Sequence, residues 1–107
     1  MTDCIVILVS VGSRAEGERI AAALVGEQLA ACVNIIGPMR SIYRWENEIR
    51  HDDEWLLVIK APATRFEALA ARVRALHSYE TPEVVALPIT AGSEGYLEWV
   101  RSVTCAE

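Results

Sequence analysis

Imidazole, phenol and carboxylate groups crowd into one short stretch of the chain, which runs from residue 76 to residue 83 and reads Leu-His-Ser-Tyr-Glu-Thr-Pro-Glu. An imidazole can bind a metal ion or transfer a proton, and a nearby carboxylate can orient its ring. The stretch lies where helical spacing gives way to a strand pattern, and such connections often carry binding residues on a rigid scaffold. It is therefore the first candidate for a functional site.

His77 permits two interpretations. It closes the apolar stripe of a helix, where a histidine commonly interacts with the helix C-terminus or forms a packed hydrogen bond. It can instead bind a metal ion or an anion through one ring nitrogen while a nearby carboxylate, Glu80 or Glu83, orients the ring, with Tyr79 close by. The first role is structural, and the second makes His77 the candidate metal ligand. The sequence leaves both open.

Lys60 is the single lysine of the chain and lies where the third strand is expected to end. A half-buried ammonium group needs a carboxylate partner, and Glu83 is a candidate. Such a pair either fixes the geometry between strands or subunits, or marks an anion site at a subunit boundary. The aromatic side chains of Tyr43, Trp45 and Trp99 fit the wall of a pocket there, and equally fit interface anchors. The predicted ligand-binding cleft between subunits comprises Tyr43, Trp45, Lys60, His77, Tyr79, Glu83 and Trp99.

A second string with metal-ligand chemistry runs from His51 to Glu54, and its nitrogen and oxygen donors suit a hard or borderline divalent ion. Adjacent residues of an extended chain point in opposite directions, so at most two of these side chains can share an ion. A solvated hairpin loop is the favoured interpretation. Cys32 lies among apolar residues and is expected to be an inert core thiol.

Nothing in the motifs predicts catalysis. No serine or cysteine lies beside a predictable base, and neither Gly12-Ser13 nor Gly92-Ser93 fits a phosphate-binding loop. We therefore expect a binding protein and not an enzyme.

Composition restricts the class of protein further. The 107 residues, 1–107, form a single domain of common size. The net charge is −5 and the basic residues are spread among acidic neighbours, so we expect no nucleic-acid binding. No apolar stretch is long enough to span a membrane, and three cysteines without a CxxC pair argue against a disulfide framework. Both observations predict a cytoplasmic protein. A hydrophobic content of 52% is high for so short a chain and predicts a homo-oligomer.

The first half of the chain predicts two strands around a helix. The apolar run 5–11 indicates a buried strand, and the capping box formed by Ser13 and Glu16 starts a helix that we expect to reach Leu29. Residues 31–46 form one long strand with a bulge or bend at Gly37-Pro38. The polar segment 47–53 is expected to be a hairpin loop, in which Asn47 adopts a left-handed conformation.

The second half repeats the order. A strand at 55–59 closes at Pro62, and a second capping box, Thr64 with Glu67, precedes a helix at 65–77. A fourth strand is expected at 84–89, where Pro88 indicates an edge strand or a strand end, and Ser93 caps a short last helix. The order βαββαβ plus a C-terminal helix is the ferredoxin-like α+β arrangement, an antiparallel sheet with two helices on one face. The other sheet face must then meet another subunit.

Five strings in register resemble the CutA family of divalent-cation tolerance proteins. They span nearly the whole chain, namely Leu29–Asn34, Ser41–Trp45, Glu54–Lys60, His77–Glu83 and Tyr96–Trp99. The resemblance implies a ferredoxin-like fold assembled as a tight homotrimer, related in architecture to the PII signal-transduction proteins. It also implies a role in tolerance of divalent cations, chiefly copper.

The resemblance further implies copper ligands at positions 9, 76 and 77. This chain has Val9, Leu76 and His77 there, so only the histidine is retained. Soft copper ligation uses thiolate and imidazole groups. The expected function is therefore weak divalent-metal binding or the sensing of a small ligand at subunit clefts. The alternatives are a PII-like signalling scaffold that binds a small anionic metabolite, and a structural trimer that acts through protein partners.

Overall fold

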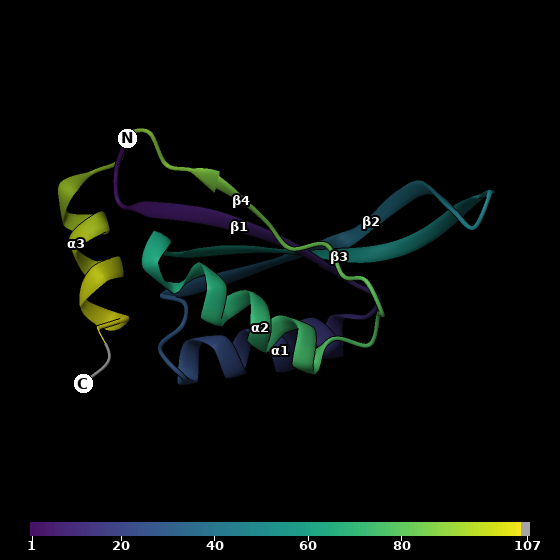
Figure 1. Cartoon of the computed structure of the whole chain (residues 1–107), viewed down its shortest axis with the longest axis horizontal. Coiled ribbons are helices and arrows are strands. Elements are labelled where there is room, and N and C mark those ends of the chain that lie inside the picture. The colour runs from purple at the N-terminus through teal and green to yellow at the C-terminus, as the bar shows by residue number, and fades with distance from the viewer. Residues whose placement is uncertain (106–107) are drawn as a thin grey trace.

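The computed structural model describes residues 1–105 and has a ferredoxin-like α+β fold (Figure 1). The antiparallel sheet has the strand order β2-β3-β1-β4. The predicted βαββαβ order with a C-terminal helix is confirmed, because the elements are β1 (Cys4–Val11), α1 (Arg14–Gly26), β2 (Cys32–Trp45), β3 (Glu48–Pro62), the 3-10 turn η1 (Ala63–Arg65), α2 (Phe66–Leu76), β4 (Val85–Pro88) and α3 (Glu94–Val103).

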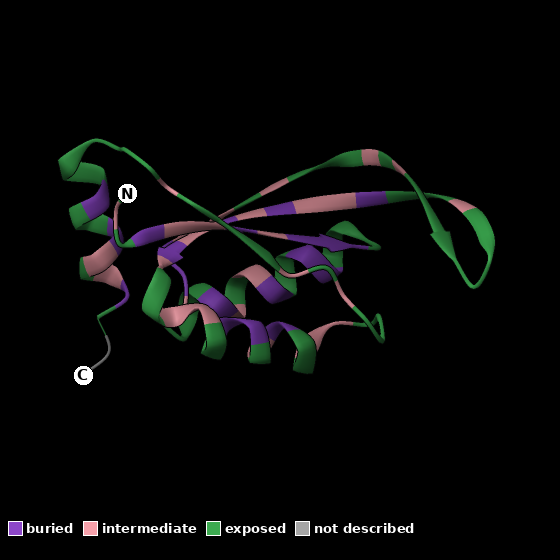
Figure 2. Ribbon diagram, turned by 45° about the horizontal axis from the view of Figure 1, so that its top comes forward, coloured by how far each residue is buried: buried purple, intermediate pink, exposed green. Residues whose placement is uncertain are grey.

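Helices α1 and α2 cover one face of the sheet, and the core lies between these two layers (Figures 1 and 2). Successive strand residues point to opposite faces, so every second residue of β1 and β3 faces the helices. The large fully buried side chains of this core are Ile7, Val9, Val11, Ile20, Leu24, Leu57, Ile59, Leu69 and Val73. Helix α3 packs at one end of the sheet around Cys4, Leu97 and Val100.

The other face of the sheet carries apolar side chains that neither α1 nor α2 covers. Leu8 pairs with Val58 across β1 and β3 on this face, and Val85 and Leu87 of β4 extend it with exposed fractions of 47% and 51%. Scattered apolar residues are normal at a surface, whereas a contiguous strip across several strands marks an interface. We call this surface the open sheet face; its apolar residues are Val6, Leu8, Ile36, Leu56, Val58, Val85 and Leu87.

Strands β2 and β3 continue beyond the rest of the sheet as a two-stranded ribbon. The last pair of β1 is Val11 with Trp55, whereas the pairing of β2 with β3 runs on to Trp45 with Glu48. Figure 1 shows this ribbon projecting from the body of the molecule. We call residues 39–54 the hairpin arm. The predicted bulge is confirmed, because the register shifts between Ile36 and Met39, and the Gly37-Pro38 peptide bond is cis.

The predicted loop at 47–53 is wrong. Only Glu46 and Asn47 form the turn, with φ values of 53° and 66°, and β3 begins at Glu48. Residues 48–53 pair with β2 because a two-residue left-handed turn keeps both strands in register. Their polarity reflects a ribbon with two solvated faces and does not indicate a loop. The left-handed conformation predicted for Asn47 is confirmed.

The helix boundaries differ from prediction by a few residues. Helix α1 ends at Gly26 and not at Leu29, because the chain turns at Gln28 with φ 61° and the amides of Leu29 and Ala30 return to the carbonyl of Leu24. Helix α2 spans Phe66–Leu76, one residue shorter at each end than predicted.

The helix caps are only partly as predicted. The Ser13 hydroxyl accepts the amide of Glu16 at 3.1 Å, but the Glu16 carboxylate bonds to a distant loop. The predicted capping box at Thr64 is wrong. Because η1 precedes the helix, Arg65 occupies the cap position of α2, and it makes no side-chain cap bond. Ser93 occupies the cap position of α3, also without a side-chain cap bond.

An ion pair joins α3 to the N-terminal segment, because the Arg101 guanidinium lies 2.9 Å from the carboxylate of Asp3.

Within residues 1–105, no helix combines the length and the apolar character that crossing a bilayer demands.

Candidate functional site

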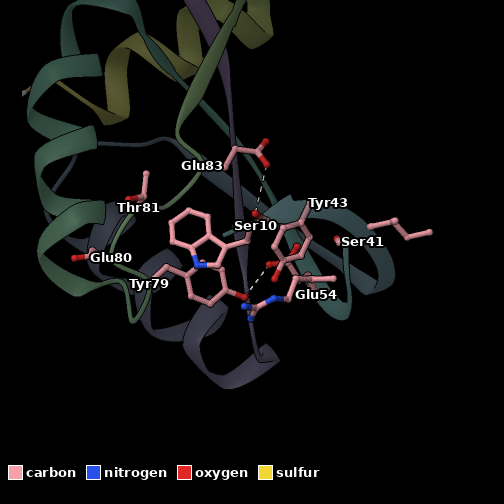
Figure 3. Close-up of a pocket in the computed structure, with 11 residues that line it drawn as sticks. Ser10, Ser41, Tyr43, Glu54, Tyr79, Glu80, Thr81 and Glu83 are labelled. Carbon is pink, nitrogen blue, oxygen red and sulfur yellow. Dashed lines mark hydrogen bonds between the residues drawn. The ribbon is translucent and has the colours of Figure 1, made fainter. Parts of the chain in front are cut away.

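A cavity of about 690 Å³ lies where the hairpin arm meets the segment that follows α2 (Figure 3). Its volume is in the range of small-molecule sites. Three chain regions contribute its walls: the end of β1, both strands of the arm, and residues 79–83. The lining residues are Ser10, Ser41, Ile42, Tyr43, Trp45, Arg50, Glu54, Tyr79, Glu80, Thr81 and Glu83.

Strand alternation explains why the lining residues of the arm, apart from Ile42, share one face. Tyr43 pairs with Arg50 across the arm, and residues two apart on each strand share a face. Ser41, Tyr43 and Trp45 therefore lie beside Arg50 and Glu54. By the same alternation this face continues into the open sheet face, so the cavity sits at one end of it.

Glu54 and Tyr79 form the polar centre of the cavity. Glu54 is 7% exposed, and the Tyr79 hydroxyl donates to its Oε2 at 2.7 Å (Figure 3). Burial, followed by the hydrogen bond and the negative charge of Glu54, raises the pKa of Tyr79 well above its ordinary value. The phenol therefore stays protonated and acts as a hydrogen-bond donor to the carboxylate.

Two further hydroxyl groups also donate to carboxylates here. The Tyr43 hydroxyl donates to Asp52, and this hydrogen bond is the main cause that raises the pKa of Tyr43. The Ser10 hydroxyl donates to Oε1 of Glu83 at 3.4 Å (Figure 3). The donor hydrogens of all three hydroxyls are thereby used within the protein.

Arg50 supplies the cationic side chain of the lining. Its Nη2 lies 3.6 Å from Glu46 and 3.5 Å from Glu48 near the tip of the arm. Its Nε is buried and has no hydrogen-bond partner within residues 1–105. The guanidinium is thus held between the arm carboxylates and the cavity.

His77 lies beneath the cavity in a closed hydrogen-bond network. Its side chain is fully buried, its Nε2 donates to the carbonyl oxygen of Ser10 at 2.8 Å, and its Nδ1 accepts the amide of Tyr79 at 3.0 Å. Oε2 of Glu16 lies 3.5 Å from Nδ1 and also accepts the amide of Ser78 at 2.7 Å. His77 thus positions Tyr79, whose ring lies 4.7 Å from the imidazole.

The predicted cleft residues divide into two groups. Tyr43, Trp45, Tyr79 and Glu83 line the cavity, whereas Lys60, His77 and Trp99 do not. Trp99 is on α3, 5.6 Å from the ring of Tyr96.

The predicted pairing of Lys60 with Glu83 is wrong within the chain. The Lys60 ammonium donates to Asn34 and to the carbonyl of Val58, and Glu83 binds Ser10. Lys60 pairs with Val6, four residues along β1 from Ser10, which places it far along the open sheet face from the cavity. Cys32 is half-buried beside Lys60 on this face and is not a core thiol as predicted.

Sequence reasoning missed Ser10, Arg50 and Glu54 as lining residues. The signal that could have found them is the alternation of the arm. Had 48–53 been assigned to a strand, Arg50 and Glu54 would have fallen on the face of Tyr43.

Comparison with known proteins decides the family. Residues 5–103 match the family described as CutA1 divalent ion tolerance protein. This chain belongs to that family. The divalent-cation tolerance protein CutA of Thermus thermophilus is 50% identical over 99 residues, which are 92% of this chain and 96% of that protein. Its relative named "Protein CutA, chloroplastic" from Arabidopsis thaliana is 47% identical over 100 residues, 94% of this chain.

Structural comparison confirms the CutA fold. The solved divalent cation tolerance protein (Cut A1) from Thermus thermophilus matches with a TM-score of 0.91 and 48% identity, covering 92% of this chain and 96% of that one. The chain spans about half the length of the curated plant and human relatives, with 55%, 56% and 49% of their sequences covered.

The copper ligands that the CutA resemblance implies do not fit this chain. Val9 is fully buried in the core, and Leu76 packs against that core. Both ring nitrogens of His77 are already hydrogen-bonded, so neither offers a free lone pair to a metal. Across residues 1–105, no three His, Cys, Asp or Glu side chains converge as a metal site would require.

The four side chains from His51 to Glu54 do not converge on one metal position either. These residues belong to β3, so Asp52 and Glu54 face the cavity side of the arm while the other two face away.

Proposed function

We propose that this CutA chain supports tolerance of divalent cations as a homotrimer, and that its ligand enters the cavity between the hairpin arm and residues 79–83. The family match over residues 5–103 supports the tolerance role. The observation that carries the assembly is the open sheet face, with the cavity at its end. A neighbouring copy packed on that face would border the cavity and make it a cleft between subunits.

The apolar character of this face supports the trimer. Exposed side chains lie on strands at both edges of the sheet, with Ile36 of β2 at 54% and Leu87 of β4 at 51%. Burying such side chains stabilises an assembly by about 25 cal/mol per Å² of apolar area, which favours self-association. The arm adds Ile42 and Ile49 on its opposite face, exposed at 64% and 54%, as further apolar surface for a neighbouring copy.

A resident copper ion is not part of this proposal. The hydrogen bonds of His77 give it a structural role, in which it positions Tyr79. In this proposal the protein increases tolerance of divalent cations without holding one as a resident cofactor. The proposed role is binding, without a catalytic step.

The PII-like alternative, a small anionic metabolite, is disfavoured by charge. Arg50 is the single cation of the lining, and the same lining holds Glu54, Glu80 and Glu83. Anion sites need converging cations or amide donors.

We place the protein in the cytoplasm within this proposal. Cys4, Cys32 and Cys105 are all free thiols, which suits a reducing compartment. Cell fractionation of the tagged full chain tests the assignment.

Growth and copper binding test the proposed role. In a bacterium that lacks its own CutA gene and is sensitive to copper, the wild-type gene should restore growth, and light scattering coupled to size exclusion should give three chain masses. Calorimetric copper titration should give equal, weak affinities for wild type and His77→Gln. A folded His77→Gln protein that loses tight copper binding, or a monomeric wild type, would contradict the proposal.

A further inference from the structure

The geometry points to a small organic cation as the ligand of the cavity, namely an amine with an apolar carbon body. This inference rests on the proposed role of the cavity and adds the chemical class of its occupant. Three features carry it: the charge of the lining, its hydrogen-bonding capacity and its aromatic walls.

The charge of the lining favours a cation. Glu54 and Glu83 face the cavity and Glu80 lies at its rim, whereas Arg50 is the single lining cation (Figure 3). Arg50 is also partly neutralised by Glu46 and Glu48, within 3.6 Å of its Nη2. Negative charge thus remains in a partly enclosed space, where charges are weakly screened.

The hydroxyl groups of the lining add hydrogen-bond acceptors to this negative charge, whereas Nε of Arg50 is the one buried donor without a partner within residues 1–105. The hydroxyls of Ser10, Tyr43 and Tyr79 each donate to a carboxylate, so toward a ligand they offer only lone pairs. Glu54 is more than nine-tenths buried, and within residues 1–105 only its Oε2 receives a hydrogen bond. Its Oε1 receives none and is not sealed from solvent, so it can accept a hydrogen bond from a ligand in the cavity. A primary ammonium supplies three donors.

The walls suit the carbon body of such a ligand. Tyr43, Trp45 and Tyr79 line the cavity beside the carboxylates. Aromatic rings attract cations through their faces and pack against methylene groups. Recognition of an inorganic ion would not require this aromatic lining.

Four-carbon probes that differ only in their end groups separate the possibilities. Butane-1,4-diamine, butane-1,4-diol and butanedioate are cationic, neutral and anionic at the same chain length. We expect calorimetry and thermal shift on the wild-type protein to detect the diamine alone. Equal binding of the diol, or preferential binding of butanedioate, would overturn the inference while leaving the cavity as a ligand site.

Glu54→Gln is the matched variant, because the amide oxygen can still accept from Tyr79 while the charge is lost. It should weaken diamine binding at least about tenfold, which corresponds to about 1.4 kcal/mol. Glu98→Gln removes the same charge on exposed α3 and should leave the affinity unchanged, which controls for attraction by net charge. Trp45→Ala, at a side chain 41% exposed, should also weaken binding without unfolding the protein.

The remaining outcomes each decide the question. Equal diamine affinities in the wild type and Glu54→Gln would overturn the inference. It would also be overturned if stoichiometric copper displaced the diamine from the wild type but did not bind Glu54→Gln. If no probe binds the wild-type protein and Glu54→Gln dissociates the trimer, a neighbouring chain fills the cavity and the inference fails. The proposed function is tested by growth rescue and by the trimeric mass, and neither result depends on which probe binds. A failure of the inference can therefore be distinguished from a failure of the proposed function.

Discussion

Glu16 links the start of α1 to the segment that carries the cavity. Its carboxylate is 5% exposed, accepts the amide and hydroxyl of Ser78 at 2.7 and 3.0 Å, and lies 3.5 Å from His77. One buried acceptor therefore fixes the chain just before Tyr79. The polar side chains at the start of this segment have a structural role, and those at its end line the cavity.

Glu16→Ala should destabilise the protein by about 2–3 kcal/mol, since it removes the charged, buried acceptor of two hydrogen bonds from Ser78. The control is Glu18→Ala on the same helix, whose exposed pair with Arg14 contributes less than about 0.5 kcal/mol. Urea unfolding at equal protein concentration measures both. Similar midpoints for the two variants would show that the Glu16 contacts contribute little.

Tyr79 predicts a stability change at alkaline pH. Its pKa in the folded protein is raised above the unfolded value of about 10, so the folded state favours the neutral phenol. This contribution is fully present below about pH 10 and is lost as pH rises through the folded pKa. The melting temperature of wild type should therefore fall more steeply above about pH 10 than that of Tyr79→Phe.

The Tyr79→Phe variant also has an expected effect at neutral pH. It should be less stable by about 1–2 kcal/mol, because Glu54 loses its donor. Tyr43, Tyr96 and Cys4 have raised pKa values as well, so both proteins should retain some alkaline slope. Parallel melting curves across the alkaline range would rule out a special role for Tyr79.

At the scale of elements, apolar periodicity was enough to predict the strands and helices of the body. It failed at the arm, where Glu48–Asp53 reads as a loop because no core exists there to impose an apolar face. Turn chemistry at Glu46-Asn47 and cross-strand pairing determine that region instead. Because the arm was missed, Arg50 and Glu54 were missed as partners of Tyr43. The same limit explains Lys60: residue type suggested a carboxylate partner, but strand register placed Asn34 beside it.

The bulge in β2 gives the prediction at this scale. A Cβ added at Gly37 would lie 2.7 Å from Cδ1 of Trp55 and 3.1 Å from the carbonyl oxygen of Glu54, so β3 would have to move at the edge of the cavity. Gly37→Ala should destabilise the protein by about 1–3 kcal/mol. Gly95→Ala in α3, where a Cβ meets nothing within 4 Å, should stabilise it by up to about 1 kcal/mol.

Thermal unfolding compares the two glycine variants, and diamine titration shows whether the strain reaches Glu54. Gly37→Ala should weaken diamine binding, whereas Gly95→Ala should bind as wild type does. Equal stability of Gly37→Ala and wild type would mean that the bulge relaxes without cost and does not hold the cavity wall.

At the scale of the whole molecule, the open sheet face connects the features described above. Lys60 and Asn34 lie at one end of it, the cavity lies at the other, and apolar side chains fill the space between them. A protomer with helices on one sheet face alone leaves this strip in water. In the proposed trimer, assembly and ligand binding are coupled by geometry, because the surface that would contact a neighbour also borders the cavity.

Leu87→Glu tests this coupling. Leu87 pairs with Val6 on the open sheet face and is 51% exposed, so a glutamate there leaves the protomer folded but places a charge in the proposed interface. An unpaired charge buried at an interface costs several kcal/mol, enough to dissociate the assembly at micromolar concentration. Light scattering should give one chain mass for Leu87→Glu with unchanged circular dichroism, and diamine binding should weaken with it. Val25→Glu, 43% exposed on α1, should keep the wild-type mass. A trimeric Leu87→Glu protein would place the interface on another surface.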